Sequence, residues 1–194
     1  MSAEKSNAPS TPSGEKPPAL TRLLIDTFGQ AIESHHARRG EETVVISRAR
    51  MSEIFRFLKE DRRCDFCFMM DLTAVDYLPR QPRFELVVHL KSLNLHHRLR
   101  VKVALPENAL EVDSITGLWT AADWYERECQ EMYGIVFKGH PGMEHLLLYE
   151  GFQGHPLRKD YEKGHAQPLV PLRPVRERYN YGETFTPVDP AAQN

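Results

Sequence analysis

Four histidines in the last third of the chain are the residues whose type could support metal chemistry. His140 and His155 belong to two copies of Gly-His-Pro, His145 and His165 lie nearby in the sequence, and Glu144 adds an oxygen donor. Their spacing matches neither His-Glu-x-x-His nor paired Cys-x-x-Cys, the compact patterns that hold zinc. Proline favours an extended backbone in the residue before it, so each Gly-His-Pro histidine suits a loop staple bonded to backbone carbonyls. A free-standing metal-dependent enzyme using these histidines is the alternative from another class.

A dithiol spacing, Cys64 to Cys67, could support redox or metal chemistry. A redox pair usually opens a helix after a strand, and a zinc knuckle requires a second pair, which the sequence lacks. Phe66 and Phe68 interleave with the two cysteines, and we therefore expect small core residues here. The chain has three cysteines, an odd number that fits free thiols in a reducing compartment.

Other signatures of catalysis or nucleotide binding are absent from the sequence. It contains no Gly-rich phosphate loop of the Rossmann or P-loop type and no Gly-x-Ser-x-Gly nucleophile elbow. Asp71 and Asp76 flank the end of an apolar segment and could act as acid–base groups, but carboxylates are common where a strand meets a loop. We therefore predict no catalytic, cofactor-binding or metal-binding residue in this chain, which favours a scaffold.

The composition is that of one folded domain with tails. The chain has 194 residues, of which 41% are hydrophobic, enough for a core. A net charge of −2 gives no electrostatic reason to expect nucleic acid or an anionic membrane surface as a partner. No apolar run approaches the ~18 residues of a membrane span. Residues 1–18 are rich in Ser, Pro, Ala, Lys and Glu, and we expect a disordered lead-in with neither a secretory signal nor a mitochondrial presequence.

Residues 19–161 are expected to form an α+β domain. Apolar residues at helical spacing predict a first helix from Leu20 through Ile32, which Gly40 caps after two arginines. A second helix is predicted at Met51–Glu60, with an inward face of Ile54, Phe55 and Leu58.

The middle of the chain is predicted to be a mixed or antiparallel sheet on which the helices pack. Residues 43–47 form a short β-branched strand, and residues 66–72 are apolar enough for a strand covered on both faces. Residues 84–91 and 98–105 alternate between apolar and polar side chains around a turn near 92–95, which indicates an antiparallel hairpin. Its second strand has one packed face and one basic face.

A third, charged helix is predicted after residues 120–123, which form a capping box, and it ends at Gly134. Asp123, Arg127 and Glu131 follow one another at i, i+4 spacing on its outer side. We expect ion pairs on both sides of Arg127, each contributing about 0.3–0.5 kcal/mol.

Glu128 is the unusual residue of this helix, because it falls in the apolar sector beside Tyr125 and Met132. A carboxylate there must either lie at the edge of the core or bond a cation. We expect Arg158 or Lys159 to supply that cation and thereby tie the helix to the second Gly-His-Pro loop.

Residues 162–194 change character. Recurrent prolines forbid a long helix or a central strand, yet the segment keeps many apolar and aromatic residues. We expect an extended Pro-rich C-terminal tail that lies along a partner.

The charged helix and the two Gly-His-Pro motifs resemble the C subunit of the proton-pumping NADH:quinone oxidoreductase, respiratory complex I, whose mitochondrial equivalent is the iron–sulfur-protein-3 subunit. The resemblance covers roughly residues 20–162 and departs from the usual pattern at Gln130, Glu131 and Glu144. The strings that carry it are Arg83-Phe84-Glu85, Ser114-Ile115-Thr116-Gly117-Leu118-Trp119, Glu126-Arg127-Glu128, Gly134-Ile135, Phe137-x-Gly139-His140-Pro141 and Gly151-Phe152-x-Gly154-His155-Pro156-Leu157-Arg158-Lys159-Asp160-Tyr161.

The resemblance implies a peripheral-arm subunit that bears no cofactor of its own. It would pack against the quinone-site D subunit and neighbouring iron–sulfur subunits, while NADH, FMN, iron–sulfur clusters and quinone are bound by other subunits. The chain would belong to an enzyme without an active site of its own, holding its neighbours in place during electron transfer from NADH to quinone coupled to proton translocation. It would reach the membrane only through the complex, on the cytoplasmic side of the bacterial inner membrane.

Two other interpretations are open at this point. The equivalent subunit of a membrane-bound hydrogenase, or of another quinone-linked dehydrogenase, would share the domain and differ in its partners. A general protein-binding module with no redox context is the plainer interpretation.

Overall fold

The structure, a computed structural model, describes residues 18–164 and 166–168. The chain divides into two units, Met1–Lys163 and Gly164–Asn194, and the elements below all belong to the first. Most of the expected lead-in at 1–18 and most of the expected tail at 162–194 lie outside the described residues. The elements are α1 (Ala19–Phe28), η1 (Gly29–Ala31), β1 (Ile32–Arg38), β2 (Glu41–Ile46), η2 (Arg48–Arg50), α2 (Met51–Glu60), β3 (Phe68–Asp76), β4 (Phe84–Lys91), β5 (Arg98–Leu105), η3 (Glu107–Ala109), β6 (Glu111–Asp113), α3 (Ala122–Tyr133) and β7 (Val136–Lys138).

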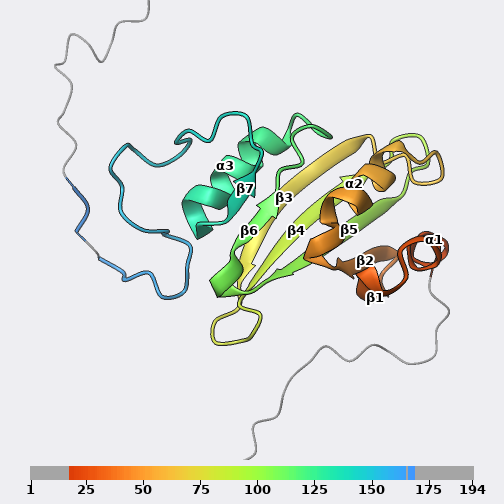
Figure 1. The fold of residues 1–194 in the computed structure, drawn as a ribbon, viewed down its shortest axis with the longest axis horizontal. Coiled ribbons are helices and arrows are strands. Elements are labelled where there is room, and N and C mark those ends of the chain that lie inside the picture. The colour runs from red at the N-terminus through yellow and green to blue at the C-terminus, as the bar shows by residue number, and fades with distance from the viewer. Residues whose placement is uncertain (1–17, 165, 169–194) are drawn as a thin grey trace, which may run out of the picture. The chain divides into compact units, whose positions relative to one another are not determined.

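A five-stranded mixed sheet forms the centre of the first unit, which confirms the α+β class. Its strand order is β1-β2-β5-β4-β3, and every neighbouring pair is antiparallel except β2 with β5. The short strands β6 and β7 form a separate parallel pair. Figure 1 shows α2 in front of this sheet, α1 beside the β1–β2 hairpin, and α3 beyond β3.

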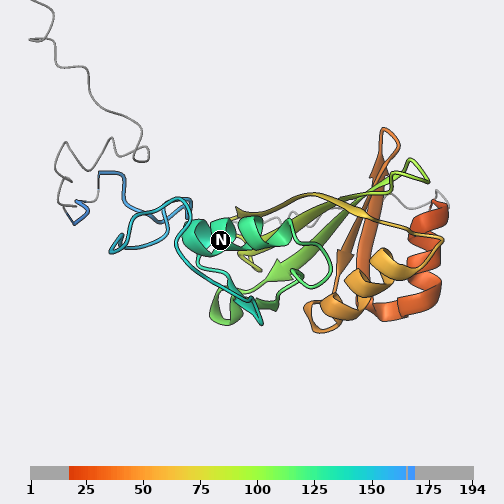
Figure 2. The same cartoon turned by 90° about the horizontal axis from the view of Figure 1, so that it is seen from above.

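Helices α1 and α2 pack together on one face of the sheet, as the turned view in Figure 2 also shows. The rings of Phe28 in α1 and Phe57 in α2 meet edge to face, with centroids 5.2 Å apart. Helix α2 has the predicted bounds, and its inward residues Ile54, Phe55 and Leu58 are fully buried. Burial of such side chains stabilises the fold by about 1.5–3 kcal/mol each.

The predicted hairpin of β4 and β5 is confirmed, with Val88 opposite Val101. On one face of β5, Leu99, Val101, Val103 and Leu105 are buried in the core. The opposite face of β5 carries Arg98, Arg100 and Lys102, as the alternation predicts.

The predicted first helix was too long. It ends at Phe28, and the residues expected to continue it form η1 and β1 instead. Strand β1 pairs with β2, which confirms the strand predicted at 43–47. Arg39 (φ 53°) and Gly40 (φ 82°) have positive φ at both positions of the two-residue connection, which is the geometry of a type I′ hairpin turn. Gly40 therefore closes a hairpin and does not cap a helix. The apolar spacing reaches Ile32 because η1 continues the winding for three residues before the strand begins.

The strand predicted at 66–72 lies instead at Phe68–Asp76, and only one of its faces is well buried. It begins at Phe68, whose side chain is exposed, and buried and less buried residues then alternate along β3 to Asp76. The prediction of cover on both faces was therefore wrong. Tyr125 and Cys129 of α3 donate hydrogen bonds to the carbonyls of Met70 and Leu72, so this helix covers the outer edge of β3.

Helix α3 begins at Ala122 without any side-chain cap, so the predicted capping box does not form. Its end is as predicted, because Gly134 adopts a left-handed conformation at φ 76° and its N–H bonds the Gln130 carbonyl.

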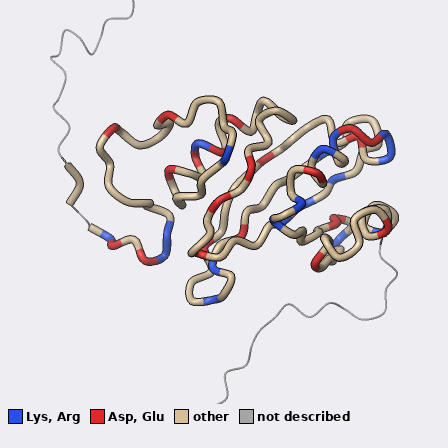
Figure 3. The backbone as a smooth tube through the Cα atoms, in the orientation of Figure 1, with Lys and Arg blue, Asp and Glu red and all other residues tan. Residues whose placement is uncertain are grey.

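No helix within 18–164 and 166–168 is long and apolar enough to cross a bilayer. Figure 3 shows acidic and basic residues interspersed along the described chain, in keeping with the small net charge.

Candidate functional site

The two Gly-His-Pro motifs hold opposite ends of α3. The ring of His140 lies 3.0 Å from the Asp123 carboxylate and 3.3 Å from the Asp123 carbonyl, at the beginning of the helix. The ring of His155 lies 2.8 Å from the Glu131 carbonyl, in the last turn. The prediction that these histidines are loop staples bonded to carbonyls is therefore confirmed. We name residues 139–161, which run between and just beyond these contacts, the wrapping loop.

The wrapping loop also supplies donors to carbonyls that the end of α3 leaves without helical partners. The Leu157 N–H bonds the Met132 carbonyl at 3.2 Å, and Arg158 Nε bonds the Tyr133 carbonyl at 2.7 Å. The close approach requires Gly134, because a Cβ there would lie 2.5 Å from the His155 ring and 2.6 Å from the Arg158 guanidinium. The glycine thus ends the helix and makes room for the loop.

Glu131 is a buried carboxylate that binds the middle of the wrapping loop. It accepts the N–H groups of Leu146, Leu147 (2.8 Å) and Leu148, and the His145 ring lies 3.0 Å away. Burial alone would raise the pKa of Glu131, but these donors outweigh it and hold the pKa below its usual value. The Glu131 carboxylate therefore serves as the hydrogen-bond acceptor for three backbone N–H groups that have no partner in a helix or sheet.

Arg127 holds the neighbouring part of the loop from the same helix. It donates from Nε and Nη2 to the carbonyls of Glu144 and His145, each at 2.9 Å, and its guanidinium lies 5.4 Å from the centre of the Trp124 ring. The predicted ion pairs of Arg127 with Asp123 and Glu131 do not form, because the loop occupies that side of the helix.

A second anchor joins the end of the wrapping loop to the sheet through Arg83, whose side chain is 2% exposed. Its Nε and Nη2 bond both carboxylate oxygens of Asp76 at 3.0 and 2.7 Å, and Nη1 and Nη2 bond those of Asp160 at 3.1 and 2.6 Å. Nη1 also bonds Glu107 at 2.6 Å. We name these four residues the Arg83 cluster.

The Arg83 cluster pairs its buried charges fully. The Lys159 N–H adds a bond of 2.8 Å to Asp76, whose pKa Arg83 holds far below its usual value. Asp160 is half exposed, and its pKa is lowered by Arg83 too. Asp76 is therefore an anion with a structural partner rather than the acid–base group that the sequence left open.

Glu126 is the second buried carboxylate of α3, and within the described chain only one of its two oxygens accepts a hydrogen bond. Its Oε1 accepts the Ile115 N–H at 2.7 Å, whereas its Oε2 has no hydrogen-bond partner among the described residues. Burial raises the pKa of Glu126 against the opposing effect of the Ser114 hydroxyl and the Ile115 N–H. The burial of Glu126 and Glu131 was not predicted, because helical periodicity does not reveal the loop that covers them.

The expected partner of Glu128 is not found. Arg158 bonds the Tyr133 carbonyl, and Lys159 contributes its backbone N–H to Asp76. Glu128 is half-buried and takes part in no ion pair among residues 18–164 and 166–168. The link between helix and loop exists, but Glu131 and the backbone of α3 form it.

The candidate metal ligands are bonded elsewhere. His140, His145 and His155 face Asp123 or Glu131 as described, and Glu144 contributes its carbonyl to Arg127. His165 lies outside the described residues. Across the part of the chain that the structure describes, no group of three or more His, Cys, Asp and Glu side chains is placed to hold a metal ion.

The two cysteines of the dithiol spacing have different surroundings. Cys64 is buried, and burial raises the pKa of its thiol to about 12. Cys67 is exposed, so the expectation of two core residues was correct only for Cys64.

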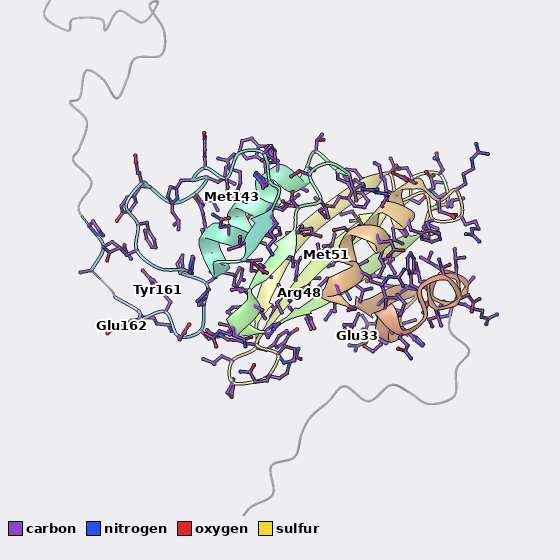
Figure 4. The ribbon with its side chains drawn as sticks, viewed as in Figure 1. Glu33, Arg48, Met51, Met143, Tyr161 and Glu162 are labelled. Atoms are coloured by element: carbon purple, nitrogen blue, oxygen red, sulfur yellow. The ribbon has the colours of Figure 1, made fainter. Side chains whose placement is uncertain are left out.

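Large apolar side chains remain exposed around α3 and the wrapping loop. The exposed residues of this region are Trp124, Val136, Leu147 and Leu157. Figure 4 shows Met143 next to α3 and Tyr161 farther along the loop. Aromatic rings continue outward from Tyr149 to Phe152 and then to Tyr161, with successive centroids 5.6 and 6.4 Å apart. A loop bonded at several points that still exposes apolar groups is typical of a surface for a protein partner.

Residues 44–167 match the family described as the 30 kDa subunit of respiratory-chain NADH dehydrogenase. The chain belongs to this family. The match begins within β2 and includes β3, β4, β5, α3 and the whole wrapping loop.

Curated relatives of the family cover most of the chain. It is 40% identical over 167 residues to the C 2 subunit of NADH-quinone oxidoreductase from Rhizobium meliloti, covering 86% of each chain. It is 46% identical over 145 residues to the C subunit of NADH-quinone oxidoreductase from Caulobacter vibrioides, covering 74% of this chain and 73% of the relative.

Two solved structures resemble the fold. A trypsin-resistant fragment of Nqo5 is 32% identical, with a TM-score of 0.56 over 63% of this chain and 98% of the fragment. A chain of the membrane-bound sulfane sulfur reductase, an archaeal respiratory membrane complex, reaches a TM-score of 0.65 over 86% of this chain and 93% of its own length. At 23% identity the second likeness concerns the fold alone.

Proposed function

We propose that this chain is a peripheral subunit of NADH-quinone oxidoreductase that carries no redox centre and positions its neighbours during electron transfer from NADH to quinone. The observation that carries the proposal is the wrapping loop, which lies within the family match and is bonded to α3 and to Arg83. The names of the curated relatives, C subunits of NADH-quinone oxidoreductase, support the same assignment.

In this proposal the chain contributes to electron transfer by holding its neighbours rigidly in place. Electron transfer between subunits depends on the distances between their cofactors, so a neighbour that holds those subunits in register contributes without reacting. The buried bonds of Glu131 and Arg83 restrict the wrapping loop, and its exposed Leu147 and Leu157 are placed to enter a partner. Hydrophobic anchors surrounded by polar groups are the usual core of such interfaces.

The partners in this proposal are the quinone-site D subunit and the neighbouring iron–sulfur subunits. Other subunits of the complex, not this chain, would bind NADH, FMN, the iron–sulfur clusters and quinone. Association with the membrane would run through the complex, on the cytoplasmic side of the bacterial inner membrane. The hydrogenase-type alternative is not favoured, because the similarity to the NADH-quinone oxidoreductase relatives reaches 46% identity, whereas the sulfane sulfur reductase chain shares 23%.

Affinity capture of this chain from membranes extracted in mild detergent tests the proposal. We expect flavin and iron–sulfur subunits in the captured material, together with NADH:quinone activity. Captured hydrogenase subunits would instead support the hydrogenase-type alternative. A monomer without partners would contradict both assignments. Stoichiometric zinc or iron in the isolated chain would instead support the metal-dependent enzyme.

A further inference from the structure

The sheet has a second face that no described helix covers. Helices α1 and α2 lie on the opposite face, and α3 lies along the edge of β3 (Figures 1 and 2). The strand registers place Arg100 of β5 between His89 of β4 and Thr43 of β2, and Lys102 lies two residues along on the same face. We name this surface the open face. Its charged and imidazole residues are His36, Arg38, Glu41, Asp71, Glu85, His89, Lys91, Arg98, Arg100 and Lys102.

Arg100, at the centre of the open face, is weakly partnered for a half-buried guanidinium. It reaches His89 at 3.3 Å, Thr43 at 3.4 Å and Glu41 at 3.7 Å, all longer than a strong charge-assisted bond. Arg83 has carboxylate bonds of 2.6–2.7 Å by comparison. Arg100 therefore retains donors that a further carboxylate could take.

The other charges do not neutralise this region. Lys102 is bonded to Glu85 at 2.6 Å, and Arg80 approaches the same carboxylate at 3.6 Å. Glu41 lies 3.7 Å from both Arg98 and Arg100, so one carboxylate serves two guanidinium groups. The open face thus carries five basic residues against three acidic ones. They are Arg38, Lys91, Arg98, Arg100 and Lys102, against Glu41, Asp71 and Glu85.

The positive charge of the open face also affects the pKa values of its two histidines, His36 and His89. Burial lowers the pKa of His89, and the charge of Arg100 lowers it further. Burial also lowers the pKa of His36, together with the charges of Lys102 and Arg100. Both imidazoles are therefore mostly neutral at pH 7, and they add hydrogen-bonding edges beside the guanidinium.

We propose that the open face is a docking surface for an acidic segment of a neighbouring subunit, with a carboxylate seated on Arg100. A shallow hollow at this place is lined in part by Glu41, His89, Arg98 and Arg100. A carboxylate entering it would complete the hydrogen bonding of Arg100 and add to the negative charge that Glu41 supplies. The inference rests on the proposed function, because it requires a neighbour.

Charge complementarity selects this occupant over segments of the chain itself. A second copy that docked through its own open face would set one excess of positive charge against another, which is repulsive. Residues 1–17 contain two lysines and two glutamates, so they carry no net charge. Residues 165–194 contain three arginines and three acidic residues, so they are equally neutral.

The test compares Arg100→Glu with Arg56→Glu, a matched reversal at an exposed position of α2. Each variant is expressed in place of the wild type, and the complex is captured through another of its subunits and washed with increasing NaCl. We expect Arg100→Glu to lower the retained chain at least tenfold, while Arg56→Glu is retained like the wild type. Equal retention of the two variants overturns the proposal.

Zero-length carbodiimide cross-linking of the wild-type complex keeps the test independent of folding in the variants. We expect Lys91 or Lys102 to be joined to an Asp or Glu of another subunit. Cross-links only within this chain, or to a second copy of it, overturn the proposal. Cross-links from Lys91 or Lys102 to an Asp or Glu in a complex that lacks NADH dehydrogenase subunits would refute the proposed function and still support docking at the open face. A wild-type chain without any partner would refute both proposals.

Discussion

The ring of His155 bonds the Glu131 carbonyl at 2.8 Å, while the carboxylate of Glu131 accepts backbone N–H groups of residues 146–148. One residue of α3 thus receives the wrapping loop at two places, once through its backbone and once through its side chain. Removing either contact weakens the hold of the helix on the loop without touching the sheet core. The predictions begin with these contacts.

Replacing His155 with Ala removes the staple at the end of α3. We expect a loss of about 1 kcal/mol in the free energy of unfolding, as for one hydrogen bond, with faster amide exchange at Leu157. Urea unfolding and hydrogen exchange measure both. His36→Ala, at an exposed position of β1, is the control and should change neither; equal losses in the two variants would show that the staple contributes nothing specific.

Glu131→Gln and Glu126→Gln are the same substitution on one helix, with opposite expected effects. The pKa of Glu131 is lowered in the folded protein, so its stabilisation is present above the unfolded pKa of about 4.3 and is lost as the pH falls through the folded pKa. Glu131→Gln should cost about 1–3 kcal/mol near pH 7, less at pH 3, and make the wrapping loop sensitive to protease.

The pKa of Glu126 is raised, so the wild type loses stability as the pH rises through the folded pKa. Glu126→Gln removes that loss, and its stability relative to the wild type should increase from pH 4 to pH 8. Chemical unfolding at several pH values measures both variants. Parallel pH profiles for the two variants would contradict the assignment.

The Arg83 cluster predicts unequal costs for its two aspartates. Asp76→Asn removes the charge of the fully buried carboxylate that bonds Arg83 through both oxygens and should cost about 3–5 kcal/mol. Asp160→Asn should cost less than about 1.5 kcal/mol, because the Asp160 side chain is 50% exposed and Glu107 still pairs with Arg83. Thermal and denaturant unfolding measure the two costs. Equal costs would mean that the burial of Asp76 adds nothing to its ion pair with Arg83.

Gly134→Ala should destabilise the junction of α3 and the wrapping loop by more than about 1 kcal/mol. A Cβ would collide with the ring and guanidinium packed there, and φ 76° is strained for any side chain. Gly142→Ala is the matched control, because nothing lies within 4 Å of its Cβ position and its φ is not positive. Similar stabilities for the two variants would contradict the close approach.

Local patterns in the sequence predicted the elements that bury one face. Helix α2 and strand β5 follow from periods of 3.6 and 2, because the polar side of each is more exposed than its apolar side. The same reasoning failed for Arg127 and Glu131, since the wrapping loop buries the side of α3 that a helical wheel assigns to water. No local pattern carries that information.

Strand β1, and so its hairpin with the predicted strand β2, was missed for a related reason. The parallel pairing of β2 with β5, Val44 beside Val101, depends on residues far along the chain. The turn residues Arg39 and Gly40 were the available signal for a hairpin, and the apolar stripe of α1 outweighed them in the sequence. The Arg83 cluster was equally hidden, because nothing in the sequence pairs its members.

The parallel contact between β2 and β5 also bears on biosynthesis. The ribosome makes Val44 and Ile46 long before residues 98–105. Until then, the β1–β2 hairpin has an unpaired strand edge and exposed apolar side chains. We expect chaperone association to be greatest in that interval and to end when β5 emerges.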